Sequence, residues 1–317
     1  PFMRPRLSMA ADLPFIGMVD KIFGHGYGLF VDSPDDAALL MRKVTDGEAT
    51  TRVPQVHWLP TMQTFGKDSR VYCFYFVAEG SYVAVAKAWR ARAAAKGYIV
   101  TLKEKARHNP NVLKLMGASD IWGGNSIYFA RNAKALGIDK LLINGDCPPA
   151  DMAEMAAMGY LPGRCDSYSD LWQDSDNIDP RSAALPEHAV KHANGEAMTG
   201  GATFDRSQVS LKRCTALMLD AAKKAVPPDL AKYPYEARFL DVITAEGLYE
   251  CYDPEHPMTR SDKRRYSEGI CAYFGDWGEG NLNLVAGGEH GKWWCAKYLH
   301  YLEGMQSGGH SYYFWPA

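Results

Sequence analysis

Two acidic residues end two short apolar segments in the second half of the chain. Asp241 follows residues 237–240, and Glu289 follows an apolar run at 282–286 and two glycines. Short apolar runs are typical of buried strands, and the carboxyl ends of consecutive parallel strands meet at one edge of an α/β barrel. Two neighbouring carboxylates can cleave a glycosidic bond, since one attacks or stabilises the anomeric carbon and the other protonates the leaving oxygen. The plainer alternative makes Asp241 a turn or cap residue and Glu289 a surface charge.

Further acids and aromatic residues occupy similar positions. Four other acids lie at or just past the ends of predicted strands: Asp120, Asp146, Asp166 and Asp170. A barrel would bring these carboxylates to one face. Aromatic side chains nearby could stack on sugar rings, although core packing is the simpler explanation of each. We therefore predict a substrate-binding set that comprises Asp120, Trp122, Asp146, Asp166, Tyr168, His290 and Trp293.

The elements that would position these residues alternate between strand and helix after residue 114, as in a parallel sheet. Predicted strands cover 115–122, 140–146, 161–170, 237–241 and 282–289, and predicted helices cover 127–136, 150–158, 214–226 and 262–274. Pro227 and Pro228 should end the third helix. A helical tail over 293–304 should precede a sixth strand that begins at 311–315. Because a closed barrel needs eight strands, we predict either a (β/α)₈ TIM-type barrel that is incomplete at its carboxyl end or an open sheet.

The first 80 residues read as β structure. Runs rich in β-branched and aromatic residues at 27–32, 51–58 and 70–77 are bounded by turn residues, which favours strands. We interpret residues 1–80 as part of a β-sandwich whose beginning is missing. Ser81 should cap a helix over 82–96 within a linking segment, 81–113, and the barrel domain should occupy 114–317.

The composition excludes several classes of protein. The apolar content of 47% and the charged content of 23% are those of a soluble globular chain, and the net charge of −2 offers no basic patch for nucleic acid. The longest apolar runs are too short to span a bilayer. Seven cysteines without CxxC spacing argue against a disulfide framework and against a structural zinc site. They favour a reducing compartment, with secretion left open because the chain begins at Pro1 and not at Met.

Metal and nucleophile motifs are weak. His188, His192 and Glu196 have a spacing of four, but Asn194-Gly195 interrupts the helix that such a zinc site needs. An oxygen-ligand Ca²⁺ site could form at the Asp-rich residues 174–179, although the proposed chemistry requires no cofactor. There is no Gly-x-Ser-x-Gly motif, and no cysteine stands out beside a suitable histidine.

Four segments together resemble a known group of enzymes. Residues 163–170, 239–242, 250–257 and 287–291 occur in an order similar to that of glycoside hydrolase families 101 and 129 and their bacterial relatives. The resemblance covers roughly residues 20–315. Those families join a supersandwich domain to a (β/α)₈ barrel and act on α-linked N-acetylgalactosamine with retention. The chain ends before the final strands of that barrel, which further domains or segments of the same protein could supply.

The resemblance implies roles for the two strand-end acids. Asp241 matches the nucleophile and Glu289 matches the general acid/base, so Glu289 should have a raised pKa and Asp241 an ordinary or lowered one. His290 could tune Glu289. The residues that would read the 2-acetamido group have no match here. We therefore expect a retaining α-glycosidase that acts on a carbohydrate, with no nucleic-acid or membrane partner; the alternatives are a carbohydrate-binding barrel without turnover and a metal-dependent barrel hydrolase.

Overall fold

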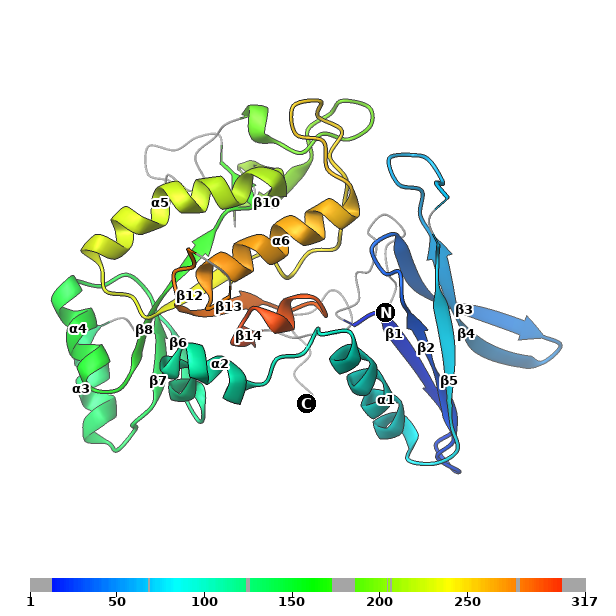
Figure 1. Ribbon diagram of the computed structural model, residues 1–317, viewed down its shortest axis with the longest axis horizontal. Coiled ribbons are helices and arrows are strands. Elements are labelled where there is room, and N and C mark those ends of the chain that lie inside the picture. Colours follow the sequence, from blue (N-terminus) through cyan, green and yellow to red (C-terminus); the bar gives the residue numbers. More distant parts are fainter. Residues whose placement is uncertain are drawn as a thin grey trace.

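A curled parallel sheet with helices on its outside forms the larger part of the molecule, and a smaller antiparallel unit lies beside it (Figure 1). The computed structural model describes residues 13–303, apart from Asp68, Gly124, Asn125, 173–185, Phe204, Arg206, Gly278 and Glu279.

The parallel sheet has six strands, β6 (Ser119–Trp122), β7 (Leu141–Asn144), β8 (Leu161–Ser167), β12 (Ala237–Asp241), β13 (Val285–Glu289) and β14 (Tyr301–Glu303). They lie in the order β14-β13-β12-β8-β7-β6, and all neighbouring pairs are parallel. The predicted mixed α/β class and the parallel sheet are therefore confirmed. The described strands make a half-barrel, so the complete eight-stranded barrel stays a prediction.

The curl of the sheet brings its two edge strands within reach of each other. Trp122 on β6 donates a hydrogen bond from Nε1 to Oε1 of Glu303 on β14, over 2.9 Å. At the amino ends of the strands, Leu142, Leu161 and Val285 form an apolar cluster with Val112 from the 3₁₀ segment Pro110–Leu115. That end of the half-barrel is closed by packing, and its carboxyl end is lined by polar groups.

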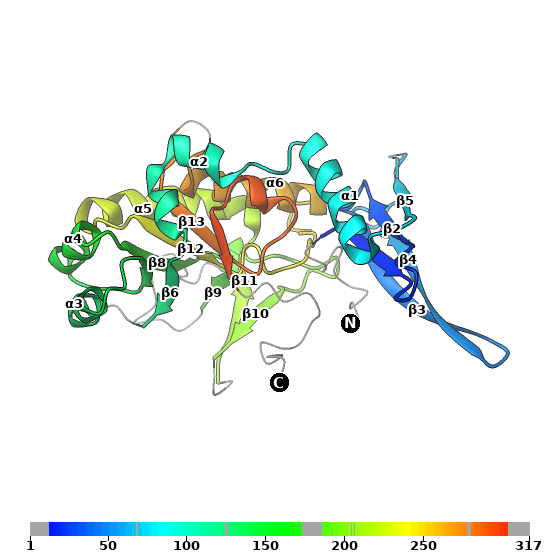
Figure 2. The same ribbon diagram turned by 90° about the horizontal axis from the view of Figure 1, so that it is seen from below.

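Helices α3 (Ile127–Ala135), α4 (Pro149–Ala157), α5 (Met218–Lys232) and α6 (Arg260–Phe274) cover the outside of the sheet (Figures 1 and 2). The short α2 (Leu102–His108) precedes the first barrel strand. Thr259 begins α6 with a capping box, in which its hydroxyl accepts from the Asp262 N–H and the Asp262 carboxylate accepts from the Thr259 N–H. This cap fixes where the chain turns back between β12 and β13.

Two helix predictions are wrong. Pro227 and Pro228 lie inside α5 and do not end it, because a buried stripe at Met218, Ala222 and Val226 holds the helix by tertiary packing. The predicted helix over 293–304 is instead a short 3₁₀ turn, Cys295–Lys297, followed by strand β14. The strand predicted at 311–315 lies outside the described residues.

The amino-terminal unit consists of a three-stranded antiparallel sheet and a long hairpin. Strands β1 (Phe15–Val19), β2 (Gly26–Val31) and β5 (Tyr72–Val77) form the sheet, and β3 (Ala37–Asp46) and β4 (Ala49–Trp58) form the hairpin. One face of β2 packs against the hairpin through Leu29 and Leu39, and its other face packs on a helix through Phe30. The predicted β-sandwich is therefore not confirmed as a whole.

Helix α1 (Ser81–Ala95) is the predicted linking helix, shifted by one residue. Ser81 does not cap it: the cap is Gly80 in a left-handed conformation, and Ser81 is the first helical residue, with φ of 54°. Its Val85 and Trp89 pack on the sheet in the same cluster as Phe30.

A second small sheet lies at the carboxyl edge of the half-barrel. Strands β9 (Asp170–Leu171), β11 (Val209–Lys212) and β10 (Thr199–Ala202) pair antiparallel in the order β10-β11-β9. None of the helices in the described part of the chain has the length and apolar character needed to traverse a lipid bilayer.

Candidate active site

A pocket of about 500 Å³ opens at the carboxyl ends of β12 and β13. Its walls come from these two strand ends and from the small sheet β9-β11-β10. The lining residues are Asp170, Thr199, Gly200, Gly201, Lys212, Asp241, Val242, Ala245, Glu246, Glu289 and His290. The pocket is therefore walled mainly by polar groups, as a site for a hydroxyl-rich ligand would be.

Asp241 and Glu289 are the last residues of two adjacent strands that run in register, with Leu240 opposite Gly288. Their side chains hydrogen-bond to each other. The Val242 N–H donates to Oε2 of Glu289 over 3.1 Å, which holds the glutamate toward the aspartate. The two carboxyl groups therefore act as one unit on the pocket wall.

The residues directly after the two acids share an unusual backbone conformation. Val242 has φ of 68° and His290 has φ of 57°. A β-branched residue at positive φ is a real outlier, and such strain concentrates at functional sites. Thr244 stabilises the second turn by donating from Oγ1 to the Glu289 carbonyl over 2.6 Å. Each strand thus turns sharply at its acid and leaves the carboxyl group at the rim.

Burial and the charge of Glu289 raise the pKa of Asp241 to about 6. The sequence led us to expect an ordinary or lowered pKa for this residue, and the structure contradicts that expectation. The reason is tertiary: Asp241 is a partly buried acid that faces another acid. His290 lies beside the pair, with Nε2 3.7 Å from Oε1 of Glu289.

A buried charge network around Asp170 also lines the pocket. Lys212 lies 3.2 Å from Oδ1 of Asp170 and 2.6 Å from Oε1 of Glu246, measured from Nζ. Lys263 approaches the other oxygen of Glu246 at 3.3 Å. Although burial opposes it, the two lysines keep the pKa of Glu246 below its usual value. Lys212 and Glu246 carried no signal in the sequence, because neither ends a barrel strand.

A second pair of acids lies inside the half-barrel. Asn144 donates to Asp120 over 2.8 Å, and burial together with Glu303 raises the pKa of Asp120 to about 8. Burial and the charges of Asp241, Asp166 and Glu303 raise the pKa of the Cys165 thiol to about 12. Glu303 was missed because its segment was predicted to be helical.

Three predicted substrate-binding residues lie away from the pocket. Asp166 is fully buried on the helix side of β8, where it pairs with Arg238 at 3.0 Å and accepts from the Tyr168 hydroxyl at 2.9 Å. Tyr168 is fully buried in the core, and Asp146 is exposed and pairs with Arg164 at 3.4 Å. Alternate residues of a strand face opposite sides of a sheet, which places Asp166 on the other side from Cys165.

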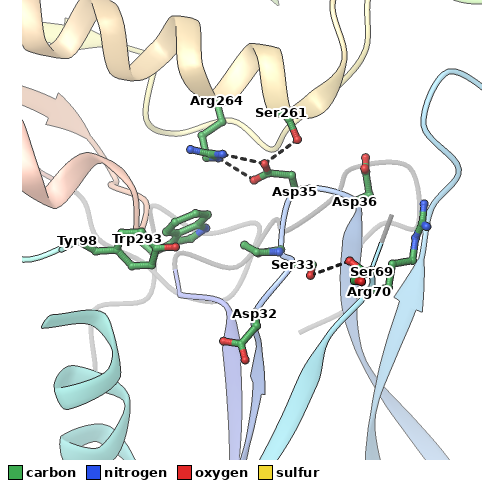
Figure 3. A pocket seen from close by; sticks show the side chains of 11 residues that line it. Asp32, Ser33, Asp35, Asp36, Ser69, Arg70, Tyr98, Ser261, Arg264 and Trp293 are labelled. Carbon is green, nitrogen blue, oxygen red and sulfur yellow. Dashed lines mark hydrogen bonds and ion pairs between the residues drawn. The ribbon is translucent and has the colours of Figure 1, made fainter. Parts of the chain in front are cut away.

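Trp293 also lies elsewhere. It is 6% exposed, packs on Tyr98 with ring centroids 4.8 Å apart, and borders a different, smaller cavity of about 270 Å³ (Figure 3). That cavity lies between the amino-terminal unit and α6, where Arg264 binds Asp35 in a bidentate ion pair. Of the predicted substrate-binding set, the structure brings His290 to the pocket and Asp120 and Trp122 to the inside of the curl.

The predicted metal positions have different outcomes. His188, His192 and Glu196 do not form a metal-binding group within the described residues. His192 and Glu196 belong to a tight turn in which the His192 N–H donates to the Glu196 carbonyl over 2.8 Å. The Asp-rich residues 174–179, where Ca²⁺ was considered, lie outside the described part of the chain.

A family model supports the interpretation of the carboxyl-terminal half. Residues 134–313 match the model described as glycosyl hydrolases related to GH101 family, GH129. No curated protein matches the chain.

Solved structures of glycosidases share the fold. The chain is similar to the α-N-acetylgalactosaminidase NagBb from Bifidobacterium bifidum in complex with Gal-NHAc-DNJ, with a TM-score of 0.74, 19% identity, and coverage of 90% of this chain and 51% of that chain. The ligand-free form of the same enzyme has a TM-score of 0.73 and 19% identity, and the match covers 90% of this chain and 54% of that chain. An α-galactosidase from Lactobacillus brevis has a TM-score of 0.51 and 12% identity, and the match covers 95% of this chain and 45% of that chain. The chain thus spans about half the length of these structures, and at such identities the similarity shows the fold.

Proposed function

This chain belongs to GH129, a family of glycosyl hydrolases related to the GH101 family, and we propose that it supplies the catalytic site of a retaining α-glycosidase. The proposed substrate is an α-linked N-acetylgalactosaminide or a related α-hexoside. One observation carries the proposal: two carboxyl groups at the ends of adjacent parallel strands share a hydrogen bond on the wall of one pocket.

The proposed reaction is a double displacement. Asp241 attacks the anomeric carbon while Glu289 gives its proton to the departing glycosidic oxygen, which leaves a glycosyl ester on Asp241. Glu289 then takes a proton from water, the water oxygen attacks the anomeric carbon, and the ester bond to Asp241 breaks. The net change at the anomeric carbon is retention, because it is inverted twice.

The raised pKa of Asp241 fits this scheme if the acid pair shares one proton. Coupled carboxyls titrate as a unit, so the proton that keeps Asp241 neutral in the free site can move to Glu289 when a substrate approaches. The direct hydrogen bond between the side chains provides the path. In retaining glycosidases the two carboxyl groups are about 5 to 5.5 Å apart, with the sugar between them.

The position of Lys212 and the acids around it in the pocket lining also supports the proposal. The Lys212 ammonium and the Asp170 carboxylate line the same pocket as the acid pair, and both can hydrogen-bond to sugar hydroxyls. We expect them to orient the ring.

Hydrolysis of aryl glycosides tests the proposal. An aryl α-N-acetylgalactosaminide should be cleaved faster than the α-galactoside, and the β-linked forms should be inert. Asp241→Asn and Glu289→Gln should each lower kcat by at least about 100-fold, because each removes a group that acts in the transition state. Asp146→Asn is the matched control, since this exposed acid lies outside the pocket, and it should retain activity.

The stereochemistry and the intermediate distinguish the remaining possibilities. Proton NMR of the first product should show the α-anomer, and a β-anomer would exclude the double displacement. Unchanged turnover in Asp241→Asn would remove this residue from the mechanism. Sugar binding without any turnover would identify a carbohydrate-binding protein instead.

A further inference from the structure

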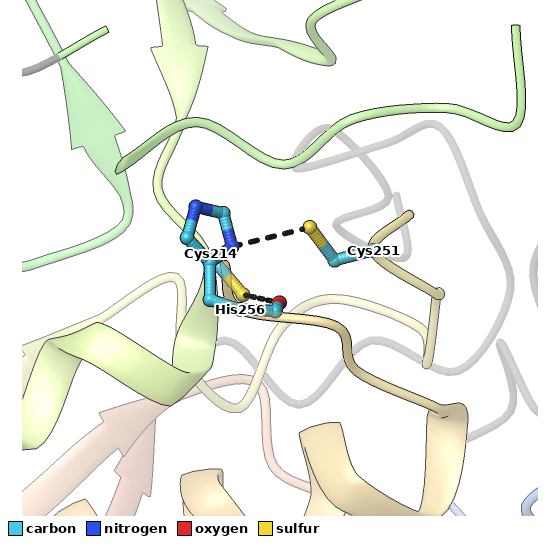
Figure 4. Close-up of side chains that lie close together, drawn as sticks. All are labelled: Cys214, Cys251 and His256. Carbon is cyan, nitrogen blue, oxygen red and sulfur yellow. Dashed lines mark hydrogen bonds between the residues drawn. The ribbon is translucent and has the colours of Figure 1, made fainter. Parts of the chain in front are cut away.

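A buried group of two cysteines and a histidine lies behind the small sheet and has no part in the proposed glycosidase chemistry. Cys214, Cys251 and His256 each offer a ligand atom, and these atoms all lie within 4.8 Å of one another (Figure 4). Cys251 Sγ is 3.4 Å from His256 Nδ1, and Cys214 hydrogen-bonds to the His256 carbonyl over 3.6 Å. Both sulfurs belong to residues with no exposed surface.

The histidine is oriented as a metal ligand would be. Its Nε2 lies 2.9 Å from the Glu187 carbonyl, which can only accept, so the proton resides on Nε2 and Nδ1 carries a lone pair. This lone pair points toward Cys251. A histidine that binds a metal almost always donates its other N–H to a carbonyl or carboxylate in this way.

The backbone presents both thiols to the same point. Cys251 and Met258 pair through two backbone hydrogen bonds of 2.8 and 3.0 Å, so the loop between them closes and folds His256 back over Cys251. The Cys214 N–H bonds to the His188 carbonyl at 2.8 Å, which fixes Cys214 at the end of β11. The Lys191 N–H donates to Cys251 Sγ over 3.5 Å and so holds this sulfur in place.

The spacing fits zinc. Zinc binds sulfur at about 2.3 Å and imidazole nitrogen at about 2.0 to 2.1 Å, so a tetrahedral ion holds the two ligand atoms about 3.6 Å apart. The 3.4 Å between Cys251 Sγ and His256 Nδ1 is close to this separation. When Zn²⁺ binds, both thiols lose their protons to solvent. The ion with two thiolates and a neutral imidazole then has no net charge, which suits a buried site.

We propose that Cys214, Cys251 and His256 form a structural site for a thiolate-binding divalent metal ion, which we take to be Zn²⁺. The fourth position would be filled by water or by the thioether of Met258, whose Sδ lies 3.9 Å from Cys214 Sγ. The site revises the expectation that these unpatterned cysteines exclude zinc: Cys251 and His256 are five residues apart, but Cys214 comes from a different segment.

The role of the ion follows from the segments that it joins. Cys214 lies two residues after Lys212, which lines the pocket, and Cys251 follows Glu250, which binds Arg260 at the start of α6. A zinc ion would fasten the small sheet to the 251–258 loop and so brace the pocket wall. A nucleophilic role for Cys251 is excluded in this arrangement, because the thiol is buried away from the pocket.

Metal analysis of the full chain, produced without a histidine tag, tests the site. After desalting, elemental analysis should find one zinc ion per chain. Cys214→Ser and Cys251→Ser should each bind Zn²⁺ more than about 100-fold more weakly, since loss of a hydrogen-bond partner of a metal ligand alone costs about 10- to 100-fold. Cys147→Ser is the control, because it removes a partly buried thiol outside the group, and its zinc content should match the wild type.

Two measurements on the unmutated chain cover the case in which the variants fail to fold. Co²⁺ added to the chelator-treated protein should give thiolate-to-metal absorption with the visible bands of a tetrahedral site. Zn²⁺ should also protect Cys214 and Cys251 from alkylation, as mapped by mass spectrometry. The proposal is overturned if reduced protein takes up no stoichiometric zinc and shows no cobalt–thiolate absorption, or if protection maps to other cysteines. Activity is not needed for any of these readings, so they are independent of the proposed glycosidase function.

Discussion

Residue 241 carries a carboxyl group at a place where both burial and a second carboxyl group favour its neutral form. Its pKa of about 6 follows from the register of two strands, which sets Asp241 beside Glu289. The proposed reaction needs an ionised nucleophile and a protonated acid, so the pair must hold one proton between its two carboxyl groups. The raised pKa of Asp241 has two testable consequences.

The first consequence concerns the rate. If the acid pair shares one proton, kcat/KM should fall about tenfold per pH unit above about pH 6, because loss of that proton leaves Glu289 with none to give to the leaving oxygen. Initial rates on the aryl α-glycoside between pH 4 and 8 measure this profile. A profile that is flat over the range would show that the ionisation of Asp241 does not control the reaction.

The second consequence concerns stability. The folded pKa of Asp241 is above its ordinary value of 3.8, so its contribution to stability is full below pH 3.8 and is lost as the pH rises through about 6. Asp241→Asn removes the ionisation and should raise the free energy of unfolding by about 1 kcal/mol at pH 8, after allowance for solvent screening. At pH 4 the gain should nearly vanish.

Urea denaturation at the two pH values checks the second consequence. Asp139→Asn is the control, because Lys134 lowers the pKa of this exposed acid and the substitution should bring no gain at pH 8. A lower free energy of unfolding for Asp241→Asn at pH 8 would contradict the interpretation that the ionised Asp241 destabilises the folded protein.

At the scale of elements, a buried ion network joins the sheet to α5. Arg238 on β12 is fully buried and pairs with Asp166 on β8 at 3.0 Å and with Asp229 on α5. Arg164 on β8 also contacts Asp229, at 3.2 Å. The network lies on the side of the strands opposite Asp241 and Glu289. It therefore holds the two strands from behind and α5 against them.

Removal of the central arginine should be costly. Arg238→Met leaves Asp166 buried with a reduced set of partners, and we expect a loss of about 3 kcal/mol in the free energy of unfolding, measured by urea denaturation. Arg265→Met is the matched control: its pair with Asp262 is exposed on α6, and its loss should change stability little. Equal effects in the two variants would show that the network does not hold α5 to the sheet.

At the scale of the whole molecule, the amino-terminal unit and the half-barrel share one continuous apolar cluster. Phe30 and Trp89 from the first part and Phe274 and Trp293 from the second belong to it. Arg264 on α6 crosses between the parts to bind Asp35. The family model covers only the second part, whereas the solved structures match across both.

Substitution of two tryptophans should distinguish a residue that packs in the core from a residue that contacts the substrate. Trp293→Phe should lower stability by about 1 to 2 kcal/mol, because it leaves a gap in the shared cluster, without changing KM. Trp122→Phe should raise KM with little loss of stability, since Trp122 is 47% exposed and holds Glu303 inside the curl. Thermal unfolding and steady-state rates on the aryl glycoside measure both. If Trp293→Phe alone raises KM, this residue belongs to the binding site after all.

The sequence by itself determined the features that depend on local pattern. Alternating runs predicted five of the six parallel strands and the helices between them, and the four family segments led to the glycoside hydrolase assignment. It also led to Asp241 and Glu289, because a residue at a strand end is positioned by the strand alone.

Only the tertiary structure decided which side of the sheet each residue faces and which distant segments meet. Asp166 and Tyr168 lie at the end of β8 as Asp241 lies at the end of β12, yet they are buried behind the sheet, because one step along a strand reverses the face. Separate loops and strands bring together Glu246 with Lys212, and Cys214 with Cys251 and His256. The spacing of these residues in the sequence does not predict that they are in contact. The pKa of Asp241 is raised for the same reason, since burial by the fold and a carboxyl group 48 residues away in sequence both favour its neutral form.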